Sequence, residues 1–136
     1  MINFNYETTF ELSNEDEIAK WISNVITAEG CLEGDINYIF CNDDDLYDIN
    51  VKFLNHDTLT DIISFDYSIG KNLHGDIYIS VERVADNAEH FDVEFSNELQ
   101  RVMVHGILHY CGYSDKTNND KVNMRAKEDH YLKQIE

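Results

Sequence analysis

The chain has 136 residues and carries 27 acidic against 10 basic side chains, a formal net charge of −17 at pH 7. A chain of this length can bury about two thirds of its unfolded surface in one domain, so it needs no disulfide or metal to fold. The acidity excludes a protein that binds nucleic acid through a broad basic surface, because a negative field repels phosphate.

Apolar periodicity predicts nine secondary-structure elements. Alternating or β-rich runs predict four strands, at residues 2–6, 35–41, 62–65 and 74–80. Apolar offsets of three and four residues predict five helices, near residues 13–30, 42–53, 81–91, 96–110 and 117–135. The third and fourth strands follow one another without a helix, which indicates a hairpin. The predicted fold class is α/β (α+β), with a mixed four-stranded sheet covered by about five helices in a single domain, residues 1–136.

The cysteines and the apolar segments bear on the compartment. Three cysteines, an odd number without Cys-x-x-Cys spacing, predict neither a disulfide framework nor a cysteine zinc site and fit a reduced setting. No run of eighteen apolar residues occurs, and the N-terminus lacks the features of a signal peptide. We therefore expect a soluble, cytoplasmic protein that does not contact a membrane.

Three consecutive aspartates open the predicted helix at residues 42–53. Asp43, Asp44 and Asp45 could be a metal cluster, but consecutive side chains on a helix point in different directions. Capping and interaction with the helix dipole are the favoured roles.

The predicted helix at residues 96–110 carries two histidines one turn apart. His105 and His109 lie on the same helical face, so both imidazoles can reach one metal ion. Gly112 follows the last apolar residue, where a left-handed glycine ends a helix and turns the chain back. This turn can deliver Asp115 to the same point. The pattern H-x3-H-x2-G-x2-D predicts a divalent metal site with ligands His105, His109 and Asp115 and an open coordination position.

This spacing occurs in more than one class of metalloprotein. Metzincin proteases share it, but their helix carries a glutamate after the first histidine as general base. Gly106 occupies that position here, which disfavours a protease of that mechanism.

Three segments resemble motifs of the YbeY family of metal-dependent bacterial endoribonucleases, in the family's order. The run from His105 to Asp115 is similar to the signature H-G-x-L-H-x-x-G-Y-x-H, with Asp115 in place of the third histidine. Residues 74–80 resemble G-D-I-x-I-S. The segment D-x-x-T-D-V-L-S-F is matched at Asp57, Thr60, Asp61, Ser64 and Phe65. Leu54 stands where the family usually has an active-site arginine.

The resemblance implies a function and its partners. It implies an α/β fold and a metal-dependent, single-strand-specific endoribonuclease that acts in rRNA maturation, at the 3′ end of 16S rRNA, and in ribosome quality control. The implied partners are single-stranded or ribosomal RNA and ribosomal particles, with no DNA and no obligate protein partner. The expected cofactor is one divalent ion, with zinc as first choice, although an aspartate ligand leaves manganese and iron open.

Other polar residues are candidates for catalysis and RNA binding. Without a glutamate beside His105, proton transfer would fall to Asp61 or His56. Half of the ten basic residues follow the metal motif, interleaved with acidic ones. The candidate substrate-binding cations are Lys116, Lys121 and Arg125.

Two alternative functions remain open. Two histidines and a carboxylate also describe the facial triad of non-haem iron enzymes, so another metalloenzyme or metal-dependent hydrolase is possible. Strict oxygen dependence would identify the iron chemistry. The third hypothesis is a non-catalytic ribosome-associated factor with a structural metal, and an open coordination position argues mildly against it.

Overall fold

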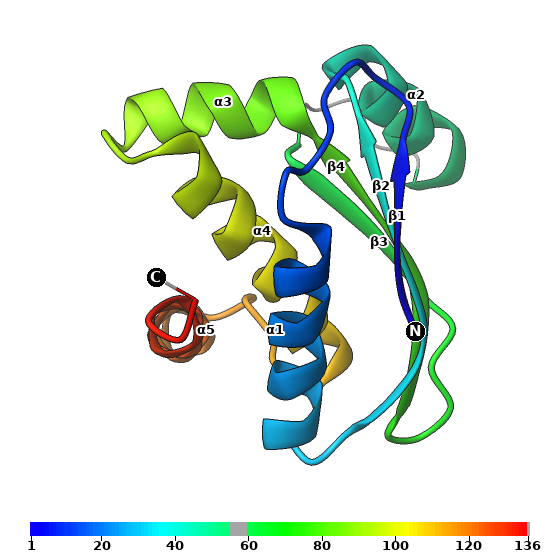
Figure 1. The fold of residues 1–136 in the computed structure, drawn as a ribbon, viewed down its shortest axis with the longest axis vertical. Helices are drawn as coiled ribbons and strands as arrows, with labels where there is room; N and C mark the ends of the chain where they lie inside the picture. Colours follow the sequence, from blue (N-terminus) through cyan, green and yellow to red (C-terminus); the bar gives the residue numbers. More distant parts are fainter. Residues whose placement is uncertain (55–59, 136) are drawn as a thin grey trace.

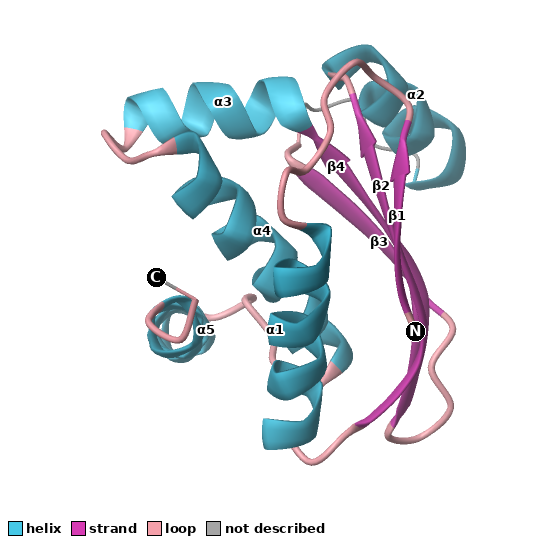
Figure 2. Cartoon of the chain, in the orientation of Figure 1, coloured by secondary structure: helices cyan, strands magenta, loops and turns pink. Residues whose placement is uncertain are grey.

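The computed structural model describes residues 1–54 and 60–135. Within them the chain forms the four strands and five helices predicted, in the predicted order (Figures 1 and 2). The strands are β1 (Ile2–Tyr6), β2 (Leu32–Cys41), β3 (Ile62–Asp66) and β4 (Asn72–Ser80). The helices are α1 (Glu15–Ala28), α2 (Asp43–Leu54), α3 (Val81–His90), α4 (Phe95–Tyr110) and α5 (Asn118–Leu132). The predicted α/β fold is confirmed.

The four strands form one mixed sheet in the order β1-β2-β4-β3. β1, β2 and β4 are parallel, and β3 pairs antiparallel to β4, as the predicted hairpin requires. Parallel neighbours need a crossover connection, and α1 supplies the one between β1 and β2. α1, α3 and α4 lie on one side of the sheet, with α5 beyond them (Figure 1).

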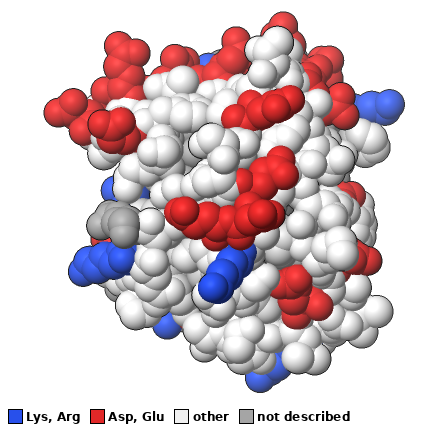
Figure 3. Space-filling model, viewed as in Figure 1, with Lys and Arg blue, Asp and Glu red and all other residues white. Residues whose placement is uncertain are grey.

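In Figure 3 acidic side chains form separate groups on the face in view and are most numerous in its upper part, where α3 lies. The exposed acidic residues of α3 and of the turn after it are Glu82, Asp86, Glu89, Asp92 and Glu94. They lie near the start of α4, whereas His105 and His109 lie in its C-terminal half. Among the described helices, none combines the length and apolarity required to cross a lipid bilayer.

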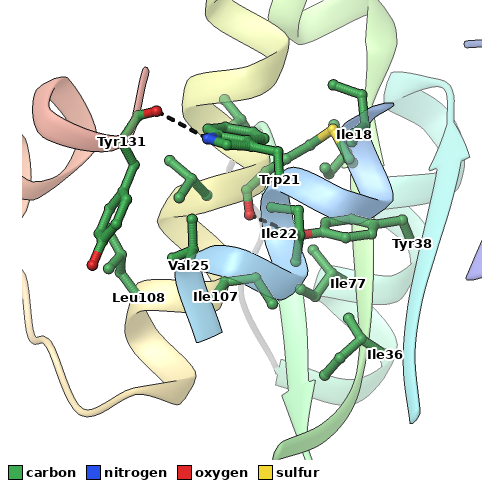
Figure 4. Packing of buried hydrophobic residues seen from close by; sticks show 14 of the residues in the cluster. Ile18, Trp21, Ile22, Val25, Ile36, Tyr38, Ile77, Ile107, Leu108 and Tyr131 are labelled. Carbon is green, nitrogen blue, oxygen red and sulfur yellow. Dashed lines mark hydrogen bonds between the residues drawn. The ribbon is translucent and has the colours of Figure 1, made fainter. Parts of the chain in front are cut away.

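The main core lies between the sheet and helices α1 and α4 (Figure 4). Alternate residues of the central strands enter it, among them Tyr38 and Ile77, both with 0% exposure. Two buried polar groups find partners there. The Tyr38 hydroxyl donates to the Met103 carbonyl at 2.9 Å, and the Trp21 indole donates to the Tyr131 carbonyl at 2.9 Å. These bonds tie α4 to the sheet and α5 to α1.

α2 packs on the opposite face of the sheet. There its Leu46 forms a second, small hydrophobic cluster with Cys41 and Ile63. Asn42, and not one of the aspartates, accepts a hydrogen bond from the Asp45 amide at 2.9 Å and caps the helix. Asp43 instead pairs with the Arg83 guanidinium at 2.9 Å. The aspartates lie in the first turn of α2, where negative charge complements the helix dipole.

Gly106 lets α4 approach the sheet closely. A Cβ atom at this position would lie 3.1 Å from Ile62 Cδ1 and 3.2 Å from Ile77 Cδ1. Residue 106 is buried and faces β3 and β4, so a general base placed there would point into the core. The structure thus also disfavours the metzincin mechanism.

Candidate metal centre

Three predicted ligand side chains meet at the C-terminal end of α4. The Nε2 atoms of His105 and His109 are 2.9 Å apart, and Asp115 Oδ2 lies 3.4 Å from each of them. The side chains are 23%, 32% and 45% exposed respectively. The three donor atoms therefore face one point that is open to solvent on one side, which is the arrangement of a centre that admits a substrate.

The turn after α4 has the hydrogen bonds of a Schellman motif. The Gly112 amide donates to the His109 carbonyl at 3.0 Å, and the Tyr113 amide donates to the Leu108 carbonyl at 3.0 Å. Gly112 has a φ of 105°, a conformation that side-chain-bearing residues rarely adopt. This reversal explains how Asp115, six residues after His109, returns to the histidines.

A hydrogen bond to the other ring nitrogen orients each imidazole. His109 Nδ1 lies 2.9 Å from the Tyr113 carbonyl oxygen, an acceptor only, so this nitrogen carries the proton. His105 Nδ1 lies 2.6 Å from Glu128 Oε2. Both rings thus donate through Nδ1 and direct the lone pair of Nε2 toward Asp115.

This donor set fits a divalent cation. Two imidazole lone pairs and a carboxylate oxygen converge, and a shared positive charge would stabilise them. Donors bound to one tetrahedral ion at about 2.0–2.2 Å are about 3.3–3.6 Å apart. The two 3.4 Å separations to Asp115 lie in this range. The 2.9 Å separation between the nitrogens needs to widen by only about 0.4 Å.

The hydrogen-bond partner of His105 was not among the site residues predicted from the sequence. Glu128 is 5% exposed and also accepts a hydrogen bond from Arg101 Nη1 at 2.9 Å, while Arg101 Nη2 binds Asp129 at 2.6 Å. A connected chain of Arg101, Glu128 and His105 thus joins α4 to α5. A signal was present, because Glu128 follows Met124 by four residues in the buried stripe of α5.

The surroundings of His105 change its proton affinity. Burial lowers the pKa of the ring, but the hydrogen bond and charge of Glu128, with the charges of Asp115 and Asp61, outweigh burial and raise the pKa above 6.5. A proton therefore competes with a metal ion for His105 at higher pH than for an unperturbed histidine.

Asp61 lies beside this centre. It lines a cleft of about 260 Å³ together with His105, Arg125 and Glu128. Its carboxylate accepts a hydrogen bond from Asn87 Nδ2 at 3.3 Å, and burial raises its pKa above the ordinary value. His56, the other candidate for proton transfer, lies outside the described residues, as does Asp57. Leu54 is the last residue of α2.

Two of the three candidate RNA-binding cations line a cleft beside the centre. Lys121 and Arg125, one turn apart on the exposed face of α5, line a second cleft of about 680 Å³ with His105 and Asp115. Arg125 also lines the first cleft, beside Asp61 and Glu128. Lys116 is exposed, and in the described part of the chain it lines neither cleft.

Fold and site define an α/β protein with a solvent-open centre of two histidines and one carboxylate, the arrangement of metal-dependent hydrolases. The sequence profile of the family described as Endoribonuclease YbeY matches residues 2–136. The chain belongs to the YbeY family, and the resemblance in its motifs is confirmed.

Individual relatives agree. The chain is 62% identical over 129 residues to Endoribonuclease YbeY of Flavobacterium johnsoniae, covering 95% of this chain and 93% of that protein. It is 59% identical over 133 residues to Endoribonuclease YbeY of Flavobacterium psychrophilum, covering 98% and 95%. The solution structure of TM1509 from Thermotoga maritima superimposes with a TM-score of 0.74 at 26% identity, covering 99% of this chain and 89% of that one. Family membership favours the endoribonuclease over the iron enzyme and the non-catalytic factor.

Proposed function

We propose that this chain is a metal-dependent, single-strand-specific endoribonuclease that acts in rRNA maturation, at the 3′ end of 16S rRNA, and in ribosome quality control. Family membership supports the reaction class. The observation that carries the proposal is the convergence of His105 Nε2, His109 Nε2 and Asp115 Oδ2 beside a cleft that Lys121 and Arg125 line. This role implies ribosomal particles as partners and a cytoplasmic location.

His105, His109 and Asp115 would hold one divalent ion, and zinc is the proposed ion because two imidazoles and a carboxylate are typical of catalytic zinc sites. When bound, such an ion supplies a Lewis acid that polarises a phosphate and promotes ionisation of water. Glu128 and the Tyr113 carbonyl keep the two rings in the tautomer that exposes Nε2. Proton transfer and phosphate binding would be the tasks of other polar residues of the chain.

Asp61 is the proposed proton carrier. Its raised pKa brings it closer to the pH at which it both accepts and releases a proton, as general acid–base catalysis requires. His56 remains a second proposed proton carrier. Lys121 and Arg125 would bind phosphates on either side of the scissile bond, and Lys116, exposed next to Asp115, would contact a phosphate further along the strand.

A direct experiment tests the nuclease. The purified protein is loaded with zinc and incubated with single-stranded and duplex RNA, with and without a chelator, and the ends of the products are mapped. We expect cleavage of single-stranded RNA that the chelator abolishes and zinc restores. Cleavage that survives complete removal of metal, or the absence of cleavage in metal-loaded protein on ribosomal particles as well as free RNA, would refute the proposal.

A further inference from the structure

A second carboxylate, outside the metal centre and its clefts, is tied to the same turn. Glu29 is the C-cap residue of α1, and its side chain is 9% exposed. The Gly30 amide donates to the Thr27 carbonyl at 3.0 Å, and the Cys31 amide donates to the Ile26 carbonyl at 3.0 Å. These are the hydrogen bonds of a Schellman motif, as at the end of α4, and they fix the backbone from which Glu29 projects.

A negative side chain at the C-terminal end of a helix is unfavourable, because the helix dipole is negative there. Glu29 therefore does not stabilise α1 by its charge. Within the described residues three donors from the other end of the chain converge on its carboxylate. The Tyr113 hydroxyl donates at 2.7 Å, Lys127 Nζ at 3.2 Å, and the Tyr131 hydroxyl forms a third hydrogen bond.

Tyr113 connects Glu29 to the candidate metal ligands. Its amide bonds the Leu108 carbonyl, its carbonyl accepts the proton of His109 Nδ1 at 2.9 Å, and its hydroxyl is held by Glu29. The Lys127 ammonium also lies 5.7 Å from the centre of the Tyr113 ring. Asp115 follows two residues later. The position of this one residue thus affects both the orientation of the His109 ring and the location of Asp115.

We propose that Glu29 is a positioning residue of the metal centre, which acts through Tyr113 to orient His109 and to hold Asp115 in place. The role rests on the proposed function in so far as these residues are metal ligands. The orientation of the His109 ring is a property of the chain without metal, so it can be measured separately.

Two variants and one matched control test the role. Glu29→Gln keeps the size of the side chain and removes its charge, and Tyr113→Phe removes only the hydroxyl that Glu29 holds. The control is Glu33→Gln. Glu33 lies four residues from Glu29, is 28% exposed, and binds Ser23 Oγ and the N-terminal ammonium group, with no contact to the Gly112 turn among the described residues. A general loss of stability would appear in the control as well.

The first readout is the tautomer of His109 in zinc-free protein, from long-range ¹H–¹⁵N correlation spectra of the ring nitrogens. The second is zinc affinity, by competition with a chromophoric chelator. Loss of a direct hydrogen-bond partner of a metal-bound histidine weakens affinity by about 10- to 100-fold. Glu29 contacts His109 only through Tyr113, so we expect zinc affinity to fall by about 3- to 10-fold in both variants. The His109 nitrogens should shift toward a mixture of tautomers, and Glu33→Gln should leave both readouts unchanged.

The outcomes separate this proposal from the nuclease. If Glu29→Gln and Tyr113→Phe leave the His109 ring and zinc affinity as in the wild type, Glu29 is not a positioning residue, whatever the activity. If the ring changes in protein that cleaves no RNA, the positioning role stands and the nuclease proposal fails. If Glu29→Gln does not fold, Tyr113→Phe alone decides, because it retains the charge, the ring and the backbone.

Discussion

Replacement of Glu128 is the sharpest test of how the metal centre is built. The Glu128 carboxylate is buried and holds His105 Nδ1 at 2.6 Å and Arg101 Nη1 at 2.9 Å. Glu128→Ala leaves the His105 N–H without its acceptor and a guanidinium that is 14% exposed without one of its two carboxylates. Removing one partner of a buried ion pair costs about 3–5 kcal/mol. Because Arg101 keeps Asp129, we expect about 3 kcal/mol, the lower end of that range.

Glu128→Gln separates stability from metal binding. The glutamine has the same size, and its amide oxygen can accept from one of the two donors, so the expected loss of stability is about 1–3 kcal/mol. Zinc affinity should fall by about 10- to 100-fold, because His105 is no longer held as the Nδ1–H tautomer by a negative partner. Urea unfolding of zinc-free protein measures the first effect, and chelator competition measures the second.

The matched control for this test is Glu98→Gln. Glu98 is also a buried acidic residue, with 7% exposure, and lines the same cleft, but in the described part of the chain it hydrogen-bonds neither histidine. Glu98→Gln should leave zinc affinity unchanged. Equal zinc affinity in wild type and Glu128→Gln would show that Glu128 does not orient the ring, and our account of the centre would then be incorrect.

Four further predictions follow from the geometry. Asp115→Ala should weaken zinc binding by more than about 100-fold, whereas Asp115→His should retain one equivalent of zinc. The pH–rate profile of Asp115→His should move to lower pH, because a neutral donor leaves more charge on the ion. Metal analysis and pH–rate measurements of both proteins check this. Gly112→Ala should lower stability by about 1–2 kcal/mol in urea unfolding, because no atom lies within 4 Å of the added Cβ and only the φ of 105° is strained. Burial raises the pKa of Glu29, but hydrogen bonds from Tyr131, Tyr113 and Lys127 outweigh burial and lower that pKa below 4.5. The ionised carboxylate therefore stabilises the fold above this pH, and the stabilisation is lost as pH falls through the lowered pKa. Glu29→Gln should consequently lose less stability than the wild type between about pH 5 and 3, measured by urea unfolding. A plot of log affinity for single-stranded RNA against log salt concentration should have a slope of about −2. The magnitude of the slope should fall by about 1.4 in the double variant Lys121→Gln/Arg125→Gln and stay unchanged in Lys133→Gln. A steep slope in the double variant would contradict the proposal that Lys121 and Arg125 bind phosphate.

The candidate ligands could be predicted from the sequence because their geometry is local. His105 and His109 are placed by helical spacing alone, and Asp115 by the turn at Gly112, whose φ and hydrogen bonds agree with the expected left-handed end of the helix. The strands and helices followed from apolar periodicity for the same reason. Errors were confined to the ends of elements, as for β2, which begins at Leu32 and not at residue 35.

The residues that orient the ligands could not be predicted in this way. Glu128 lies 23 positions after His105, and Glu29 lies 84 positions before Tyr113, so only tertiary packing brings them together. In the sequence Glu128 was one of the acidic residues interleaved with candidate RNA-binding cations. The sequence also did not distinguish among the three candidate RNA-binding cations. In the described structure Lys121 and Arg125 line the cleft beside the metal centre, and Lys116 does not.

The three roles of α5 follow from three pairs of residues four apart, each on its own stripe of the helix. Lys121 and Arg125 face the cleft, Met124 and Glu128 face the core and His105, and Lys127 and Tyr131 face Glu29. The helix is anchored at its start by the Thr117 and Asp120 capping box, directly after the Asp115 turn. A rigid shift of α5 therefore moves the RNA-binding cations and the supports of both imidazoles together. RNA affinity and metal affinity are consequently expected to be coupled, although no RNA contact is proposed for Glu128 or Lys127.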